Sequence, residues 1–287
     1  MLNQPLPDLA AWVAYFSDAQ LPILRQTARR LDEARQNIDR INGRDIAAIV
    51  LQDPLLAVRV LAYIQSFHGK HLRSEITTIA NAVMMLGVEP FFRKFESLLT
   101  VETLLKDEPQ ALLGVLQVIR RVQRASHYAH AWAFERHDMN VEEVTLAALL
   151  HDLSEILLWC FAPRLAIAIR DCQAADKSLR SAAAQEQVLG IRLVDVQLAL
   201  CEAWQLPDLL KTLMDDAHAL TPRVQNVALA VNLARHSIAG WRDAALPDDF
   251  AAIQKLLRID RATLLARLDL PAKLAAEYVL KNSAPRP

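Results

Sequence analysis

The sixteen residues 144–159, VTLAALLHDLSEILLW, constrain the fold of this chain more than any other stretch. At about 100° per residue, apolar side chains cover nearly the whole circumference of the helix that this pattern predicts. The small or polar strip consists of Thr145, Ala148, Asp152 and Glu155. A helix that is apolar on almost every side lies inside a domain. We therefore expect one continuous central helix, whose His151–Asp152 pair must be hydrogen-bonded or coordinated to be tolerated there.

The composition indicates an all-helical protein. The 287 residues include six glycines, and no alternating β-branched run looks like a strand. The glycines are isolated from one another, which excludes the clustered glycines of a dinucleotide-binding or P-loop phosphate site. The 32 Lys and Arg against 33 Asp and Glu give a net charge of −1, without a basic block. We therefore expect no nucleic-acid-binding surface.

The cysteines and the N-terminus bear on the cellular compartment. Cys160, Cys172 and Cys201 lie in helical patterns at spacings unlike those of zinc sites, and we interpret them as small core residues in a reducing compartment. The N-terminal residues lack the basic start and apolar block of a signal peptide. No apolar stretch of eighteen residues is free of charge, so we expect no membrane span and a cytoplasmic protein.

Helix start and stop signals divide the chain into three segments. Residues 1–107 are expected to form an N-terminal helical unit, which ends at a short polar stretch. Residues 108–240 are expected to form a larger helical unit that begins with a long helix over about 111–137 and contains the central helix. Residues 241–287 are expected to form a C-terminal extension of short helices. The predicted fold class is all-α.

A set of polar residues in the larger unit matches the ligands of a metal site. Metal-dependent phosphohydrolases place nitrogen and oxygen ligands from several helices around the ion and leave positions open for water. In the HD pattern these are a His, an adjacent His-Asp, and an Asp from a third helix. His127, His151 and Asp152 match the first three positions, and Asn232 is placed to supply the fourth. A neutral amide there weakens the binding of a hard cation.

With these motifs the chain resembles the HDOD proteins, bacterial signalling relatives of the HD and HD-GYP phosphohydrolases. The matching segments are LPIL at 21–24, DPLLAVRVL at 53–61, IANAVMMLG at 79–87, SHYAHAWA at 126–133, ALLHDLSEILL at 148–158 and CEAWQLP at 201–207. The resemblance runs from about residue 20 to about residue 240. It implies a multi-helix HD-like bundle preceded by a smaller N-terminal helical unit, and a role in bacterial signal transduction.

One departure from the active relatives bears directly on function. HD-GYP enzymes have Gly-Lys one residue after His-Asp, and that Lys helps to hold the substrate phosphate. This chain has Ser154-Glu155 there, and the negative charge of Glu155 repels phosphate. We interpret the metal site as degenerate, with candidate positions His127, His151, Asp152 and Asn232. No catalytic residue, cofactor or metal is expected, although weak divalent-metal binding, with His236 as a further ligand, stays open. In the favoured interpretation the pair and His127 form a buried hydrogen-bonded network that orders three helices.

Two hypotheses about function follow. In the first, the chain is a non-enzymatic signalling or regulatory module that binds a protein or a small ligand. Its partners would be other signalling proteins, such as receiver or cyclic-di-GMP-related domains, and a homodimer through the C-terminal helices is compatible with this role. In the second, the chain is a metal-dependent phosphohydrolase acting on a nucleotide or cyclic dinucleotide. The groove between the two helical units is the expected binding surface, because ligand pockets favour domain interfaces.

Overall fold

The computed structural model describes residues 1–68, 76–176, 178–215, 221–268 and 270–282. Within these ranges the regular structure is helical, and the β-type pairing is one isolated parallel bridge between Ile23 and Thr100. The expected all-α fold is confirmed. The helices, in chain order, are α1 (Leu9–Asp18), α2 (Arg25–Gln36), the 3-10 helix η1 (Ile38–Arg40), α3 (Gly43–Val50), α4 (Pro54–His68), α5 (Ile79–Leu86), α6 (Val88–Lys94), α7 (Val101–Leu104), α8 (Pro109–Glu135), α9 (Val141–Leu150), α10 (Leu153–Phe161), α11 (Pro163–Ala175), α12 (Ser181–Leu189), α13 (Leu193–Ala203), α14 (Asp208–Leu213), α15 (Pro222–His236), α16 (Leu246–Leu257), α17 (Arg261–Arg267) and α18 (Ala272–Asn282).

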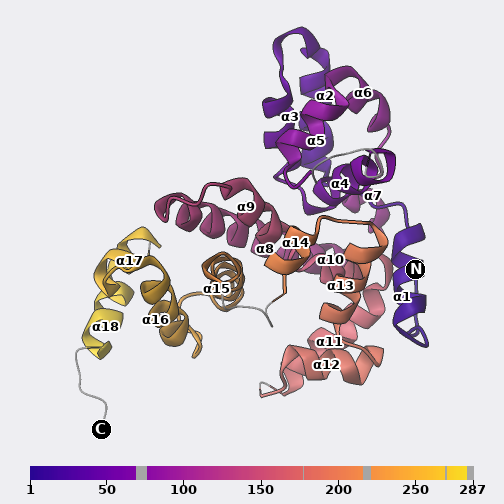
Figure 1. Ribbon diagram of the computed structural model, residues 1–287. Coiled ribbons are helices and arrows are strands. Elements are labelled where there is room, and N and C mark those ends of the chain that lie inside the picture. The colour runs from indigo at the N-terminus through magenta and orange to yellow at the C-terminus, as the bar shows by residue number, and fades with distance from the viewer. Residues whose placement is uncertain (69–75, 177, 216–220, 269, 283–287) are drawn as a thin grey trace.

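The long helix α8 is the centre of the larger part of the molecule, and α9, α10 and α15 pack along it (Figure 1). It begins at Pro109, which suits a first helical position because no backbone N–H is needed there. Its core-facing side is buried over the whole length, from Ala111 and Gly114 to Trp132 and Ala133. A helix buried in this way positions the helices packed around it through its apolar face.

A smaller group of helices, α2 to α6, lies at one end of the molecule (Figure 1). Asp53 joins the beginnings of two of them. Its Oδ1 accepts hydrogen bonds from the N–H groups of Leu55 (3.0 Å) and Leu56 (3.1 Å), as a residue preceding a helix does. Its Oδ2 accepts one from the N–H of Leu24 at 2.7 Å, just before α2. Burial raises the pKa of Asp53, and these hydrogen bonds oppose the increase.

The N-terminal helix α1 packs against α13 in the larger part (Figure 1). The N–H of Leu2 and the hydroxyl of Tyr15 both donate to the carbonyl of Phe161, at 2.9 and 3.2 Å. At the other end of the chain, α16 to α18 follow α15. The rings of Phe250 on α16 and Tyr278 on α18 meet edge to face, with their centres 5.2 Å apart. The division at 1–107, 108–240 and 241–287 stays a prediction.

The stretch expected as one continuous helix over 144–159 is divided into α9 and α10, so this expectation is wrong at one point. His151 and Asp152 form a turn between the two helices. In a continuous helix the N–H of Ser154 would donate to the carbonyl of Leu150. The side-chain amide of Gln197 on α13 takes both places instead: Nε2 donates to the carbonyl of Leu150 (2.9 Å), and Oε1 accepts from the N–H of Ser154 (2.8 Å).

The same stretch is the part of the described chain that could cross a membrane by length and apolar composition. In Val141–Phe161, 83% of the most apolar window is buried inside the protein. Leu149, Leu150, Ile156 and Leu157, for example, have no exposed surface. This burial is compatible with a core position in a globular bundle. Cytoplasmic location stays a prediction.

Replacing Gly114 with Ala tests the packing of α8 against α10. A Cβ at Gly114 would lie 2.5–2.7 Å from three ring atoms of Trp159, which is buried. Overpacking of this kind typically costs about 1–3 kcal/mol, more than the up to about 1 kcal/mol that Ala gains over Gly within a helix. We expect a lower urea midpoint for Gly114→Ala.

Gly43→Ala is the matched control. A Cβ there would meet Val83 Cγ1 at 3.6 Å, an ordinary contact, and we expect unchanged or slightly higher stability. An unchanged midpoint for Gly114→Ala would contradict the packing of the indole ring over this turn of α8.

Candidate functional site

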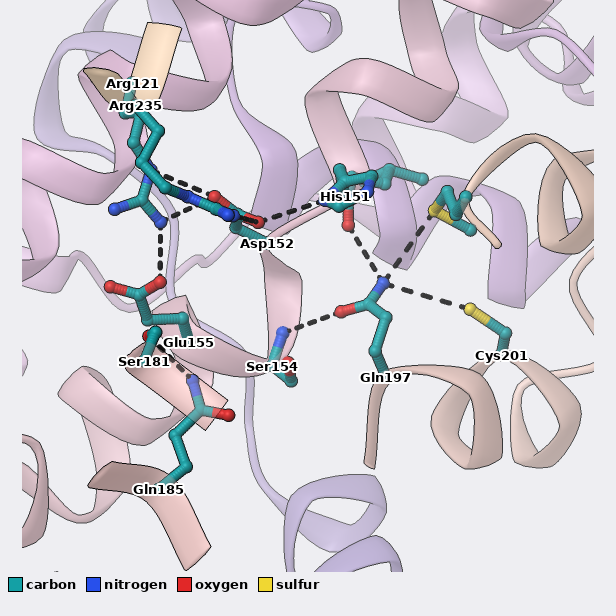
Figure 2. Close-up of polar contacts among 12 residues, drawn as sticks. Arg121, His151, Asp152, Ser154, Glu155, Ser181, Gln185, Gln197, Cys201 and Arg235 are labelled. Atoms are coloured by element: carbon teal, nitrogen blue, oxygen red, sulfur yellow. Dashed lines mark hydrogen bonds and ion pairs between the residues drawn. The ribbon is translucent and has the colours of Figure 1, made fainter. Parts of the chain in front are cut away.

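The turn between α9 and α10 holds the His-Asp pair that the sequence singles out. Nδ1 of His151 donates to Oδ1 of Asp152 at 3.0 Å, and the Asp152 side chain is 7% exposed (Figure 2). Because α9 ends before this pair and α10 begins after it, both side chains project from a turn rather than from a helix face. Gln197 fixes the turn, as described above, so α13 determines where the pair lies.

Two arginines from other helices bind the carboxylate of Asp152 (Figure 2). Arg121 on α8 donates to Oδ2 through Nε at 2.9 Å and through Nη2 at 2.5 Å. Arg235 on α15 donates to Oδ1 through Nη2 at 3.2 Å. Nη2 of Arg121 also reaches Oε2 of Glu155 on α10, at 2.5 Å. Four charged side chains thus connect α8, α10 and α15 at one point.

The charges of this cluster balance one another. Burial alone would raise the pKa of Asp152, but the guanidinium charges of Arg121 and Arg235, with the hydrogen bond from His151, hold that pKa well below its usual value. Burial would likewise lower the pKa of Arg121, and the carboxylates of Asp152 and Glu155 raise it above its usual value instead. Asp152 is therefore ionised at neutral pH, and its charge is compensated by protein groups.

Of the four candidate metal positions, the structure brings His151 and Asp152 together and leaves the other two elsewhere. His127 is exposed on α8, with its ring 6.4 Å from that of Tyr128. Asn232 lines a cavity of about 990 Å³ between α15 and α16. In the described part of the chain, no three His, Cys, Asp or Glu side chains are placed to hold an ion together.

The side chains present do not fit a divalent metal. The carboxylate of Asp152 already accepts hydrogen bonds from two guanidinium groups, and a cation beside them would meet repulsion. His236, which the sequence analysis considered as a further metal ligand, pairs instead with Asp249 on α16, with 2.6 Å between Nδ1 and Oδ2.

A sequence profile of the HDOD domain matches residues 21–220, more than half of the chain. The chain belongs to the HDOD domain family. This confirms the family resemblance seen in the sequence, and Asp152 at the centre of the cluster lies within the matched range. The match extends from the segment before α2 to that after α14. No curated protein matches the sequence at a significant level.

Solved structures share the fold of this HDOD chain. A virulence factor from Campylobacter jejuni superposes with a TM-score of 0.67 at 20% identity, covering 95% of this chain and 99% of the other. The MmoQ response regulator from Methylococcus capsulatus superposes with a TM-score of 0.60 at 16% identity, covering 84% and 98%. At these identities the likeness concerns the fold.

Sequence reasoning missed Arg121, Arg235 and Gln197. Arg121 did leave a signal, because it follows the helical spacing of the buried residues Gly114, Val118 and Ala125 on α8. A charged residue on a core-facing position predicts a buried partner of opposite charge. Gln197 left the same kind of signal, because it lies at helical spacing between the buried residues Leu193 and Leu200 on α13. Arg235 left none, since it is an exposed residue near the end of α15.

Gln197→Leu tests the hydrogen bonds that divide the central helix. The substitution leaves the carbonyl of Leu150 and the N–H of Ser154 without their partner in the core, at about 1–3 kcal/mol for each group. We expect the free energy of unfolding in urea to fall by about 2 kcal/mol or more. Gln187→Leu, on the exposed side of α12, is the control, with an expected change within about 0.5 kcal/mol. A Gln197→Leu protein as stable as the parent would mean that the helix closes without the amide.

The depressed pKa of Asp152 predicts how stability depends on pH. Since the folded-state pKa lies below the unfolded one, the contribution is fully present above about pH 4 and is lost as the pH falls through the folded-state pKa. Asp152→Asn should lower stability at pH 7 by about 3 kcal/mol, because Arg235 loses its carboxylate partner and Arg121 keeps only Glu155.

The measurement is urea unfolding between pH 7 and pH 2.5. The loss of stability on acidification should be smaller for Asp152→Asn than for the parent. Asp171→Asn, at an exposed position, should follow the parent curve. Parallel curves for parent and Asp152→Asn would refute this assignment of the acid-sensitive group.

Proposed function

We propose that this chain is a non-enzymatic signal-transduction or regulatory module of the HDOD type, which acts by binding a protein or a small ligand. The observation that carries the proposal is the state of Asp152. In the metal-dependent relatives the Asp of the His-Asp pair is a metal ligand, whereas here Arg121 and Arg235 bind it. Guanidinium groups at this carboxylate disfavour a second cation through Coulomb repulsion.

The charge balance around the pair also supports a role without phosphate chemistry. Two arginines face two carboxylates in the cluster, so it offers little net positive charge to a phosphate group. Glu155, where active relatives have a phosphate-holding Lys, neutralises Arg121 at 2.5 Å. Within this cluster the cationic side chains are thus paired with carboxylates, which weakens their ability to stabilise the negative charge of a phosphoryl transition state.

The expected partners are other signalling proteins, including receiver or cyclic-di-GMP-related domains, in the cytoplasm of a bacterium. Membership in the HDOD family is the ground for this expectation. The structural neighbour MmoQ is described as a response regulator, which is consistent with it. A homodimer is compatible with the same role, whereas nucleic acid and membrane are not expected as partners. Light scattering of the purified chain would distinguish a monomer from a dimer.

A metal and activity measurement tests the proposal. The purified protein is analysed for bound transition metals and then assayed with bis-p-nitrophenyl phosphate and cyclic-di-GMP in the presence of manganese or magnesium. We expect less than one metal ion per chain and no hydrolysis above the protein-free rate, since Asp152 is occupied by arginines. Stoichiometric metal together with hydrolysis would favour the alternative, a metal-dependent phosphohydrolase.

His151→Ala is the control for that experiment. If the pair has a structural role, the substitution removes the hydrogen bond to Asp152 and lowers the melting temperature without changing a rate. If the pair is catalytic, the same substitution abolishes the hydrolysis that the parent protein shows.

A further inference from the structure

A second polar site lies where the N-terminal helices meet the HD-like bundle. It is a cavity of about 230 Å³ between the end of α1 and the segment after it, α4, the end of α6 and the end of α13. None of the side chains around Asp152 lines it. Its volume is below the about 300–1,000 Å³ of pockets for drug-sized ligands, so an occupant must be small.

Arg59 on α4 supplies an unusual positive charge to this cavity. Its side chain is half-buried, and Nη1 donates to the backbone carbonyl of Leu21. Burial lowers the pKa of Arg59, and the charge of Asp53 raises it in part. The carboxylate of Asp53 is itself bonded by three backbone N–H groups, and within the described ranges no carboxylate lies at ion-pair distance from Arg59. A guanidinium has five N–H donors, and the carbonyl of Leu21 accepts from only one nitrogen, Nη1.

Lys94 brings a second positive charge to the cavity, and the polar residues Gln20 and Tyr63 line it as well. Lys94 at the end of α6 lies over the ring of Tyr63, 4.5 Å from its centre. Oγ of Ser17 is buried and has no hydrogen-bond partner among the residues that the structure describes. No Asp or Glu lines the cavity. Two cations among lining residues that include no acid are complementary to an anion.

Aromatic rings form the remaining walls. Tyr63 and Phe95 meet edge to face, with ring centres 6.1 Å apart, and Trp204 at the end of α13 lies on the bundle side. Flat aromatic walls beside cationic donors suit a planar ring that carries one charged group.

We propose that this cavity binds a small organic anion, a single aromatic ring bearing a carboxylate or a phosphate. The anionic group lies at Arg59 and Lys94, and the ring lies against the aromatic walls. The inference deepens the proposed binding function by naming a ligand class, and it rests on that function only for its biological meaning. Because residues of α4, α6 and α13 line the cavity, the anion contacts both the N-terminal helices and the bundle.

The test is titration of the full chain with benzoate, phenyl phosphate and the neutral analogue benzamide, followed by calorimetry and tryptophan fluorescence. We expect at least one of the two anions to bind with a change in emission, and benzamide to bind more weakly than that anion. The anion that binds identifies the charged group as carboxylate or phosphate. Trp204→Phe should remove the emission change while retaining the calorimetric signal.

A matched pair of variants on α6 locates the site. Lys94→Gln should weaken binding about tenfold, the effect of losing about 1.4 kcal/mol from one hydrogen bond to a charged group. Arg93→Gln removes the neighbouring exposed charge, which does not line the cavity, and should leave the affinity unchanged. Arg59→Gln should abolish binding. Thermal melting checks that the Arg59→Gln variant is folded. If it is unfolded, the comparison of Lys94→Gln with Arg93→Gln decides the outcome.

Three results would overturn the inference: neither anion binds at millimolar concentration, benzamide binds as tightly as the anions, or Arg93→Gln weakens binding as much as Lys94→Gln. These results would not bear on the non-enzymatic role, which the metal and hydrolysis measurements test. Conversely, stoichiometric metal with hydrolysis would refute the non-enzymatic role without affecting anion binding in this cavity.

Discussion

The ion pair between Arg121 and Asp152 is the interaction on which the HD-like bundle depends. Both side chains are largely withdrawn from water, at 14% and 7% exposure, and separating them would leave each buried charge with less compensation. The pair is stable because its geometry is good: Arg121 offers two N–H groups to one oxygen and shares its charge with Glu155. Arg235 completes the cluster from α15. The positive charges that compensate this carboxylate are thus supplied by the protein itself.

The ion pair in turn requires the turn that Gln197 creates. The amide is inserted between the carbonyl of Leu150 and the N–H of Ser154, so α9 and α10 are separate helices. Asp152 therefore lies in the turn between them rather than within a helix. The surroundings of the amide are apolar, with the sulfur atoms of Met214 and Cys201 at 3.8 and 4.0 Å. In such surroundings an unpaired backbone group is costly, so the amide holds the turn firmly.

Periodicity and the family motifs were sufficient for the fold class, and the long helix expected over about 111–137 is α8 (Pro109–Glu135). The candidate site was harder. The sequence identified the His-Asp pair, but it assigned the contact from α15 to Asn232 where the structure has Arg235. Residues that are three positions apart in a helix, such as 232 and 235, point in directions about 60° apart around the helix axis. Since α15 packs against α8, α9, α14 and α16, its apolar pattern does not reveal which side faces Asp152. The amide of Gln197 depends on a contact with another helix, which no local pattern encodes.

The distribution of charge separates the two polar sites of the protein. Around Asp152, two arginines and two carboxylates compensate each other, and little field remains to attract an anion. At the cavity beside Arg59, the lining residues include two cations and no carboxylate, so the attraction for anions is greater there. The two sites are connected through α13, which presents Gln197 to the turn before α10 and ends at Trp204 in the cavity wall. A ligand that fixes the end of α13 therefore acts on the same helix that holds the His-Asp turn. In this arrangement α13 connects the cavity beside Arg59 to the ion-pair cluster around Asp152.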